Sequence, residues 1–225
     1  MTLPSAAPEG EGIERNDILL FDPTGEAALL GEVSASGADG GDLRELLAAP
    51  DTRAGILAVL FGRDLPDVRI IAVDLEGLEP GTSRVRAGYV GSVPGFTRAI
   101  REGLEVPLGV RFDLVARYAP LERRSTDLEL SAAGFPVHWR RDVQVGLSGN
   151  WDWTDIPPDV HETSAFGELS FSARVDQGML HVAVELSIPL LRVPAADYPE
   201  FRAFLVRVDA VLEWTALATR PEPGE

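Results

Sequence analysis

Cysteine is absent from this chain of 225 residues. Its absence excludes disulfide bonds, zinc sites built on thiolates and catalysis by a cysteine nucleophile. It does not point to any cellular compartment, and the localisation stays open.

Long hydrophobic runs are also absent. No run approaches the ~18 apolar residues of a membrane-spanning helix, so we expect no membrane insertion. The segment 1–14 is rich in proline, glycine, alanine and glutamate and lacks the apolar centre of a signal peptide. We expect a disordered leader over 1–16 and a polar tail over 220–225.

Positive charge is scarce. The chain has 20 basic and 36 acidic residues, and its formal net charge is -16. A surface this acidic repels nucleic acid and anionic membranes, which leaves a protein as the expected partner. The sequence also lacks the glycine-rich phosphate and dinucleotide motifs, the zinc-protease motif and the nucleophile elbow of hydrolases. We therefore expect no cofactor, no metal and no catalytic residue.

The clearest pattern in the chain is a strand followed by a helix over 179–214. Apolar residues alternate with more polar ones from Leu180 to Ile188, which is typical of a strand buried on one face. The spacing then changes to that of a helix with an apolar stripe. Asp197 and Glu200 predict a capping box at the start of this helix.

Further strands are predicted over 18–21, 27–33, 85–89, 137–147 and 169–175, with Arg141 the one residue that breaks the alternation of its strand. The segment 68–75 changes phase, which indicates a bulge or a strand covered on both faces. The segment 106–115 also reads as a strand. The residues 176–178 predict a three-residue hairpin loop.

Two short helices are predicted after Asp42 and Asp51, and the glycine-rich stretch 37–41 reads as a loop. The fold class is therefore β-rich α+β. We expect two antiparallel sandwich-like modules, over 17–116 and 117–219, each covered by short helices, with a C-terminal helix closing the second module.

Three histidines are candidates for acid–base chemistry: His138, His161 and His181. Their spacing does not require them to meet, and we interpret them as surface or interstrand residues. A hydrolase that uses His161 with Asp159 or Glu162 is the catalytic alternative.

The segment 150–155 has the most unusual composition, with two tryptophans among acidic residues. It resembles an oxygen-rich calcium loop, but the glycine that such a loop requires is missing, which argues against a metal site. Trp151 and Trp153 are either a contact surface or large aromatics that close the end of the core.

Two arginine pairs, Arg123–Arg124 and Arg140–Arg141, are candidate contact residues. One interpretation is an anion site. The other is that they neutralise nearby carboxylates such as Glu122, Asp127 and Asp142, which suits so acidic a chain.

Two segments resemble a known bacterial family: APLERRSTDL at 119–128 and VPAADYPEFRAF at 193–204, together with DPTGEA at 22–27. They are similar to the C-terminal, non-catalytic region of transglutaminase-like proteins that carry domains of unknown function. In that family the chemistry lies in a papain-like core with a cysteine, a histidine and an aspartate, and full-length members are often exported. No segment here matches that core, so the resemblance implies no catalytic residue.

The resemblance and the missing nucleophile favour a non-catalytic accessory or interaction module that works with a transglutaminase- or peptidase-like protein. A structural subunit of a multi-protein assembly is the alternative, with exposed strand edges or the Trp151 and Trp153 loop as contacts.

Overall fold

The computed structural model describes residues 12–21, 25–79, 82–149 and 151–220. Most of the expected leader, the turns expected around 22–25 and 79–81, Asn150 and most of the expected tail fall partly or wholly outside these ranges. Residues 12–16, which we expected in the leader, belong to the first strand instead.

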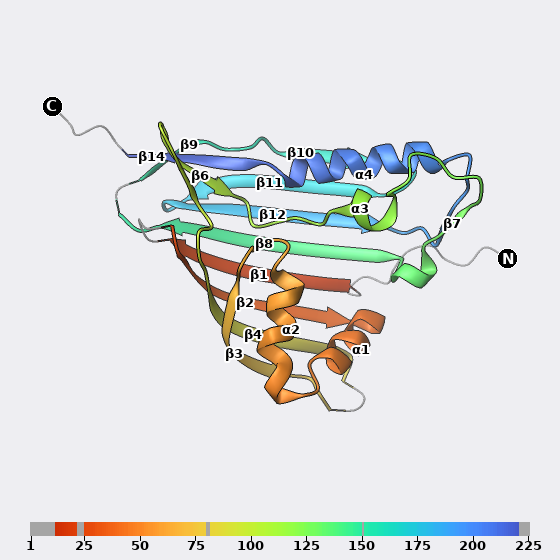
Figure 1. Cartoon of the computed structure of the whole chain (residues 1–225), viewed down its shortest axis with the longest axis horizontal. Helices are drawn as coiled ribbons and strands as arrows, with labels where there is room; N and C mark the ends of the chain where they lie inside the picture. The colour runs from red at the N-terminus through yellow and green to blue at the C-terminus, as the bar shows by residue number, and fades with distance from the viewer. Residues whose placement is uncertain (1–11, 22–24, 80–81, 150, 221–225) are drawn as a thin grey trace.

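One eight-stranded sheet crosses the whole molecule (Figure 1). Every neighbouring pair in it is antiparallel except β1 and β8, which run parallel at its centre. In spatial order the strands are β10 (Val160–Thr163), β11 (Glu168–Asp176), β12 (Met179–Ile188), β8 (Val137–Leu147), β1 (Gly12–Phe21), β2 (Ala27–Ser36), β4 (Arg84–Val93) and β3 (Arg69–Glu76).

The predicted β-rich α+β class is confirmed, but its strands are arranged differently from our expectation. Strands from both expected modules lie in one sheet, because β1 from the first segment pairs with β8 from the second. Alternation identifies the buried face of a strand and says nothing about its neighbour, so the sequence pattern does not reveal this parallel junction.

One face of the sheet carries the core and the other faces solvent. Leu19, Val145, Val182 and Phe171, from four different strands, are almost completely buried on the core face. Residues one position along each strand point the other way, because side chains alternate across a sheet. The predicted alternation of 180–188 is thus confirmed: its five aliphatic residues are all buried.

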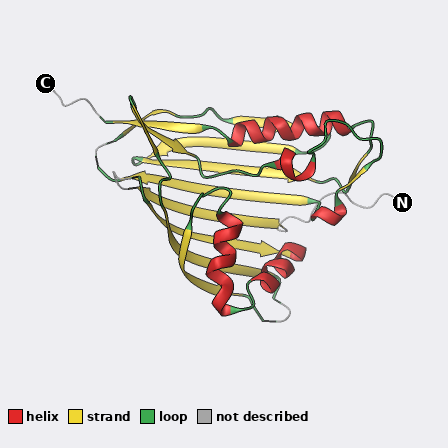
Figure 2. Ribbon diagram, in the orientation of Figure 1, coloured by secondary structure: helices red, strands yellow, loops and turns green. Residues whose placement is uncertain are grey.

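A second layer covers the core face at both ends of the sheet (Figure 2). Helices α1 (Gly37–Leu46) and α2 (Arg53–Phe61) pack on the end formed by β1, β2, β4 and β3. Helices α3 (Leu114–Tyr118) and α4 (Tyr198–Leu212) contact each other, and α4 covers the other end through residues such as Phe201, which packs edge-on against Phe166.

The second layer also contains a small sheet and several short elements. The small sheet has the order β5 (Arg98–Ile100), β6 (Gly103–Pro107), β14 (Thr215–Thr219) and β9 (Asp152–Asp155). A two-stranded pair joins β13 (Arg192–Val193) to β7 (Leu128–Glu129), and 3-10 turns occupy Pro50–Thr52 and Ser131–Ala133.

Several local expectations need correction. The strand expected over 106–115 ends at Pro107, because proline offers no N–H to continue the ladder. The hairpin after β11 has only two loop residues, Gln177 and Gly178, both with positive φ. Asp197 precedes α4 but makes no side-chain capping bond, so the predicted capping box is wrong. The bulge predicted within 68–75 is confirmed at Ile70–Ala72.

The glycine-rich stretch expected as a loop is instead the start of α1. A Cβ atom on Gly40 would lie 2.9 Å from the carbonyl oxygen of Ala35, so glycine lets the helix approach β2 closely. Tertiary packing here outweighs the low helix propensity of glycine. Within the described ranges, no helix combines the length and the apolar character that a membrane crossing requires.

Candidate functional site: an arginine-lined groove

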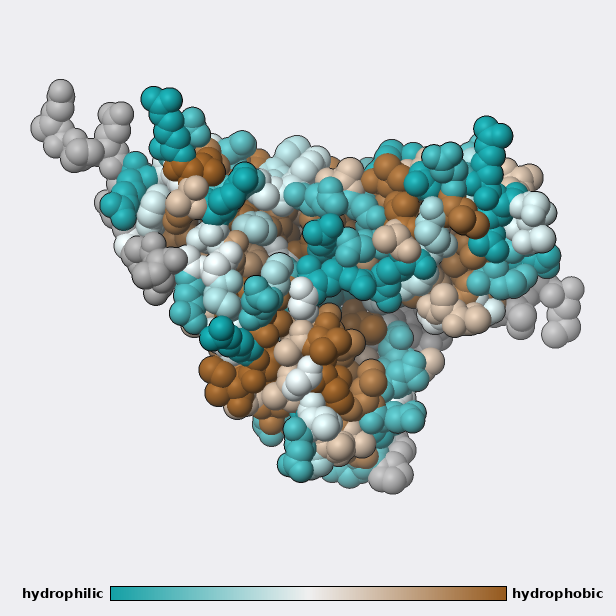
Figure 3. Space-filling model, viewed as in Figure 1, coloured by the Kyte–Doolittle hydropathy of each residue, from teal (hydrophilic) through white to brown (hydrophobic). Residues whose placement is uncertain are grey.

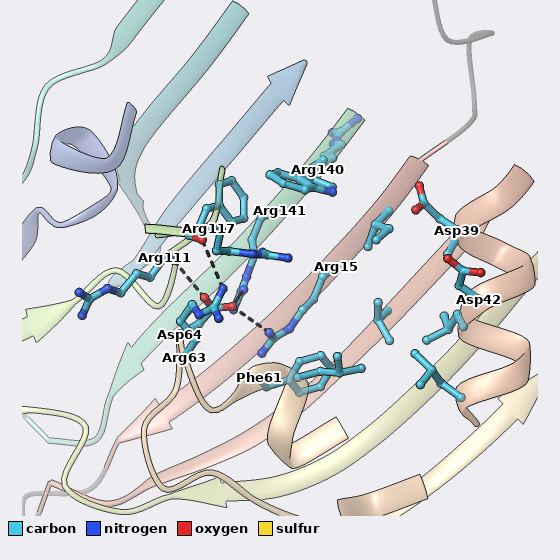
Figure 4. A pocket seen from close by; sticks show the side chains of 18 residues that line it. Arg15, Asp39, Asp42, Phe61, Arg63, Asp64, Arg111, Arg117, Arg140 and Arg141 are labelled. Atoms are coloured by element: carbon cyan, nitrogen blue, oxygen red, sulfur yellow. Dashed lines mark hydrogen bonds and ion pairs between the residues drawn. The ribbon is translucent and has the colours of Figure 1, made fainter. Parts of the chain in front are cut away.

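A groove of about 320 Å³ lies between helices α1 and α2 on one side and the segment 111–118 on the other (Figure 4). Its floor is formed by β2, β1 and β8, which places it over the parallel junction of the sheet. We call it the arginine groove, because six arginines are among its lining residues: Arg15, Arg63, Arg111, Arg117, Arg140 and Arg141. The side chain of Arg140 points to the open face of the sheet, where it pairs with Asp142. All 20 basic residues of the chain are arginines, so the other five place a quarter of its guanidinium groups on this side of the sheet.

The remaining lining is mostly apolar. Leu43 and Leu46 come from α1, Leu60 and Phe61 come from α2, and Phe112 and Trp139 form part of the opposite wall; the two rings of that wall pack 5.0 Å apart. The space-filling view shows hydrophobic residues on the α2 side of a hollow and hydrophilic residues across from them (Figure 3). The groove therefore presents apolar surface next to charge.

The floor holds a buried cluster of two arginines and two aspartates. Arg15 and Arg141 are directly opposite each other in the β1–β8 pair. The carboxylate of Asp17 lies 2.9 Å from Arg15 Nε as an ion pair and accepts a hydrogen bond from Arg141 Nη2 at 2.9 Å. Asp64, on the turn after α2, contacts Arg15 Nη1 at 3.1 Å and also pairs with Arg141. Two positive and two negative charges thus balance within the floor, as buried charges require.

Tyr89 completes this cluster from β4. Its hydroxyl donates to Asp17 at 2.7 Å and accepts from Arg15 Nε at 2.9 Å. The ring reaches over β2 because Gly31 stands between Asp17 and Tyr89 in the strand register; a Cβ atom there would lie 2.5 Å from the ring. Burial raises the pKa of Tyr89 well above its ordinary value, so the hydroxyl keeps its proton.

Arg15 is also held by an aromatic ring. Its guanidinium carbon lies 3.5 Å from the centroid of Phe61, which is a close cation–π contact. Arg141 is only 4% exposed, and its Nε has no hydrogen-bond partner in the described part of the chain. Arg15 and Arg141 therefore form a rigid base beneath the groove, and Asp17 and Asp64 neutralise its charge.

The rim carries more exposed positive charge. Arg63 and Arg111 share one carboxylate, Asp113, at 3.2 and 2.7 Å. Arg117 makes no ion pair with any residue that the structure describes, and its guanidinium carbon lies 5.0 Å from the Tyr118 ring. The rim therefore has more guanidinium groups than carboxylates.

Two aspartates anchor the segment that carries this rim. Asp209, on α4, accepts the backbone N–H groups of Leu114 and Val115 at 2.9 Å each, and Asp64 accepts the N–H of Arg111 at 3.2 Å. Burial raises the pKa of Asp209. Residues from α4 and α2 thus fix the position of the rim arginines relative to the floor.

The groove suits recognition of an anionic group beside an apolar one. Guanidinium groups match carboxylate and phosphate oxygens in a fork of two hydrogen bonds. A second cavity of about 410 Å³ shares Arg63, Asp64 and Arg111 with the groove, so these three residues separate the two cavities. Histidine and acidic side chains form no group of three or more in the described ranges that could hold a metal ion.

The structure separates the members of the predicted arginine pairs. Arg140 pairs with Asp142 at 3.2 Å, as one interpretation expected, whereas Arg141 turns to the core face and pairs with Asp17 and Asp64 instead. Arg123 and Arg124 lie in the loop before β7, away from the groove lining. Asp127, which we expected them to neutralise, pairs with Arg192.

The tryptophans lie at another edge of the molecule. Trp151 and Trp153, just before and within β9, are half-buried against the core, and Trp153 Nε1 donates to the carbonyl of Gly178 at 3.1 Å. Arg220 lies 5.0 Å from the Trp151 ring. The structure places neither tryptophan near the groove lining.

The histidines do not form the expected hydrolase arrangement. His161 is 63% exposed and lies 3.4 Å from Glu168, while Glu162 pairs with Arg207 and Asp159 accepts the N–H of Ala173. A shallow depression of about 250 Å³ joins His161, Glu168, Ser170, Glu185 and Ser187 on the open face of the sheet. His138 lies 3.5 Å from Glu185 and His181 is half-buried on β12.

Sequence reasoning missed most of the groove, including Arg15, Asp17, Asp64, Arg63, Arg111 and Arg117. One signal was present: Arg141 occupies a position where alternation requires an apolar residue. Had the first strand been extended to Gly12, Arg15 and Asp17 would have fallen on its buried face in the same way.

Comparison with protein-family models, with curated proteins and with solved structures finds no match to this chain.

Proposed function

We propose that the protein is a non-catalytic interaction module that binds a segment of a partner protein in the arginine groove. The observation that carries the proposal is the gathering of five arginines, Arg15, Arg63, Arg111, Arg117 and Arg141, beside apolar side chains in a chain whose net charge is -16. A positive patch on a protein of negative net charge is characteristic of a recognition surface, since complementary electrostatic potentials guide association.

The resemblance to transglutaminase-like proteins extends this proposal to the kind of partner. The two resembling segments, 119–128 and 193–204, pack against each other: Tyr198 donates to the carbonyl of Leu121 at 2.8 Å, and Asp127 accepts the N–H of Ala195 at 2.8 Å. They hold the fold together outside the groove lining. We propose that the partner is a transglutaminase- or peptidase-like protein, on the basis of the resemblance alone.

Two assays on the full chain test this proposal. Fluorescein-labelled casein and a glutamine peptide with a fluorescent amine report amide hydrolysis and transamidation; we expect no turnover above the buffer blank. An array of random peptides reports binding; we expect the wild-type chain to bind the same subset of peptides in repeated experiments. Turnover, or an array with no retained peptide, contradicts the proposal.

A structural subunit of an assembly is the second candidate function. The edge strand β3 carries Ile71, which is 73% exposed within a bulge, and Leu20, Leu30 and Val90 are about half exposed on neighbouring strands. An exposed strand edge and an apolar patch both favour pairing with another chain. Light scattering of the purified chain distinguishes the candidates: a defined oligomer favours the subunit, and a monomer favours the groove-binding module.

A further inference from the structure

We infer that the arginine groove binds an extended peptide in which apolar residues separate an acidic residue from a basic one. This inference rests on the proposed function and specifies the chemistry of its ligand. It follows from the distribution of charge along the groove and from the apolar surface between the charged ends.

The two ends of the groove have opposite charge. Arg63, Arg111 and Arg117 lie at one end, and Asp39 and Asp42, on α1, lie at the other (Figure 4). An anionic group is attracted to the first end and repelled from the second, while a cationic group behaves in the opposite way. A ligand that is negative along its whole length therefore fits poorly, which excludes a nucleic-acid strand.

The arginine end has the capacity to bind a carboxylate. Asp113 is shared by Arg63 and Arg111, and Glu213 lies 3.7 Å from Arg111 Nη2, so among the described residues the unpaired guanidinium at this end is that of Arg117. Arg117 makes no ion pair in the described ranges. A glutamate or aspartate side chain placed beside Arg117 would accept charge-assisted hydrogen bonds from a guanidinium whose backbone segment is held in place by Asp64 and Asp209.

The middle of the groove is apolar and accessible. Leu46 and Leu60 are each 47% exposed, whereas Leu43, Leu57 and Phe61 of the same two helices are buried in the core. Trp139 faces them across the groove floor. An apolar side chain placed here removes these surfaces from water and positions the charged residues on either side of it.

The groove is bounded at its arginine end. Arg63 pairs with Asp113, and Asp64 accepts the N–H of Arg111, so the turn after α2 and the segment 111–118 are in contact there. A ligand anchored at Arg117 therefore extends along the groove toward Asp42, past Leu46 and Leu60, as an extended peptide with an acidic and a basic residue does.

The experiment uses capped, fluorescent peptides in which a glutamate and a lysine flank leucine–alanine spacers of increasing length. Fluorescence anisotropy with the full chain gives the Kd of each peptide. We expect the best spacer to bind more tightly than the same peptide with glutamine in place of either glutamate or lysine, by about threefold to tenfold for each charge removed.

Protein variants assign each charge to its end of the groove. Arg117→Gln is expected to remove the preference for peptide glutamate over glutamine, and Asp42→Asn the preference for peptide lysine over glutamine. In each variant the protein partner of the ion pair is already missing, so removing the charge from the peptide has no further effect. Arg174→Gln, an exposed arginine on the open face of the sheet, is the matched control and is expected to keep both preferences.

The outcomes separate this inference from the function on which it rests. Binding of a peptide with two glutamates as tight as that of the mixed peptide, or equal losses in Arg117→Gln and Arg174→Gln, overturns the inference and leaves a peptide-binding module of other specificity. Displacement of the peptide by inorganic phosphate at a low concentration identifies a phosphate site instead. If no peptide binds at all, both the inference and the proposed function fail.

Discussion

Arg15 and Arg141 lie directly opposite each other across the parallel β1–β8 junction, and both guanidinium groups share the carboxylates of Asp17 and Asp64. These strands belong to segments far apart in the sequence, and their pairing joins the two halves of the sheet. The cluster therefore stabilises the sheet at its centre. The same cluster forms the base of the arginine groove. Stability of the sheet and shape of the groove therefore depend on the same four side chains.

Removing one buried carboxylate should destabilise the fold strongly. Asp17→Asn leaves two buried guanidinium groups with one carboxylate, and we expect a loss of about 3–5 kcal/mol in the free energy of unfolding, measured with urea. Asp142→Asn, which breaks the exposed pair with Arg140, is the control and should cost less than about 1 kcal/mol. Equal losses in the two variants would contradict the role of the cluster.

The hydroxyl of Tyr89 should contribute separately. Tyr89→Phe removes a donor to Asp17 and an acceptor for Arg15, and we expect a loss of about 1–3 kcal/mol because both partners stay buried. Tyr118→Phe removes a hydroxyl with no hydrogen bond to the described residues and should change stability little. A Tyr89→Phe variant with the stability of the wild type would show that the hydroxyl does not contribute to the free energy of unfolding.

Gly31 should not tolerate a side chain. Gly31→Ala places a methyl group 2.5 Å from the Tyr89 ring, which must then move away from Asp17; we expect a loss of about 1–3 kcal/mol. Gly88→Ala, in the neighbouring strand with no atom within 4 Å of the new methyl group, is the matched control. Thermal unfolding followed by circular dichroism compares the two, and a Gly31→Ala variant as stable as Gly88→Ala would refute the close contact.

Asp127 should make stability depend on pH in the acid range. The N–H of Ala195 and then the guanidinium of Arg192 lower the pKa of Asp127 below its ordinary value of 3.8. A lowered pKa in the folded state gives stability that is present above pH 3.8 and is lost as the pH falls through the folded-state value. Wild type should therefore melt at a higher temperature than Asp127→Asn at neutral pH, and this difference should shrink in strong acid. A difference independent of pH would contradict it.

Asp209 should connect the fold to the groove. Asp209→Ala removes two backbone hydrogen bonds at the start of α3, so the segment carrying Arg111 and Arg117 loses an anchor. We expect weaker binding of the glutamate–lysine peptide, by about tenfold, because ordering the segment then costs free energy on binding. Asp197→Ala, directly before the same helix and without a capping bond, should bind normally. Unchanged binding by Asp209→Ala would show that the rim needs no such support.

Strands and the long helix were predictable because their signals are local. The alternation of 180–188, the apolar stripe of α4 and the phase change in β3 each depend on residues within one element. The groove was not predictable in this way. Arg63, Arg111 and Arg117 look like ordinary surface residues in the sequence. Arg111 and Arg117 come near Arg63 only because Asp64 and Asp209 hold the segment 111–118 in place.

By itself, the sequence determined a β-rich chain without thiols, with an acidic surface and with strands that each bury one face, since these properties follow from composition and from the two-residue period of a strand. Only the tertiary structure decided that one sheet joins both halves, that Arg15 and Arg141 are neighbours, and that positive charge gathers over the junction. The physical reason is that strand pairing is a long-range choice: it depends on which buried faces and charges complement one another in space, and no local pattern records it.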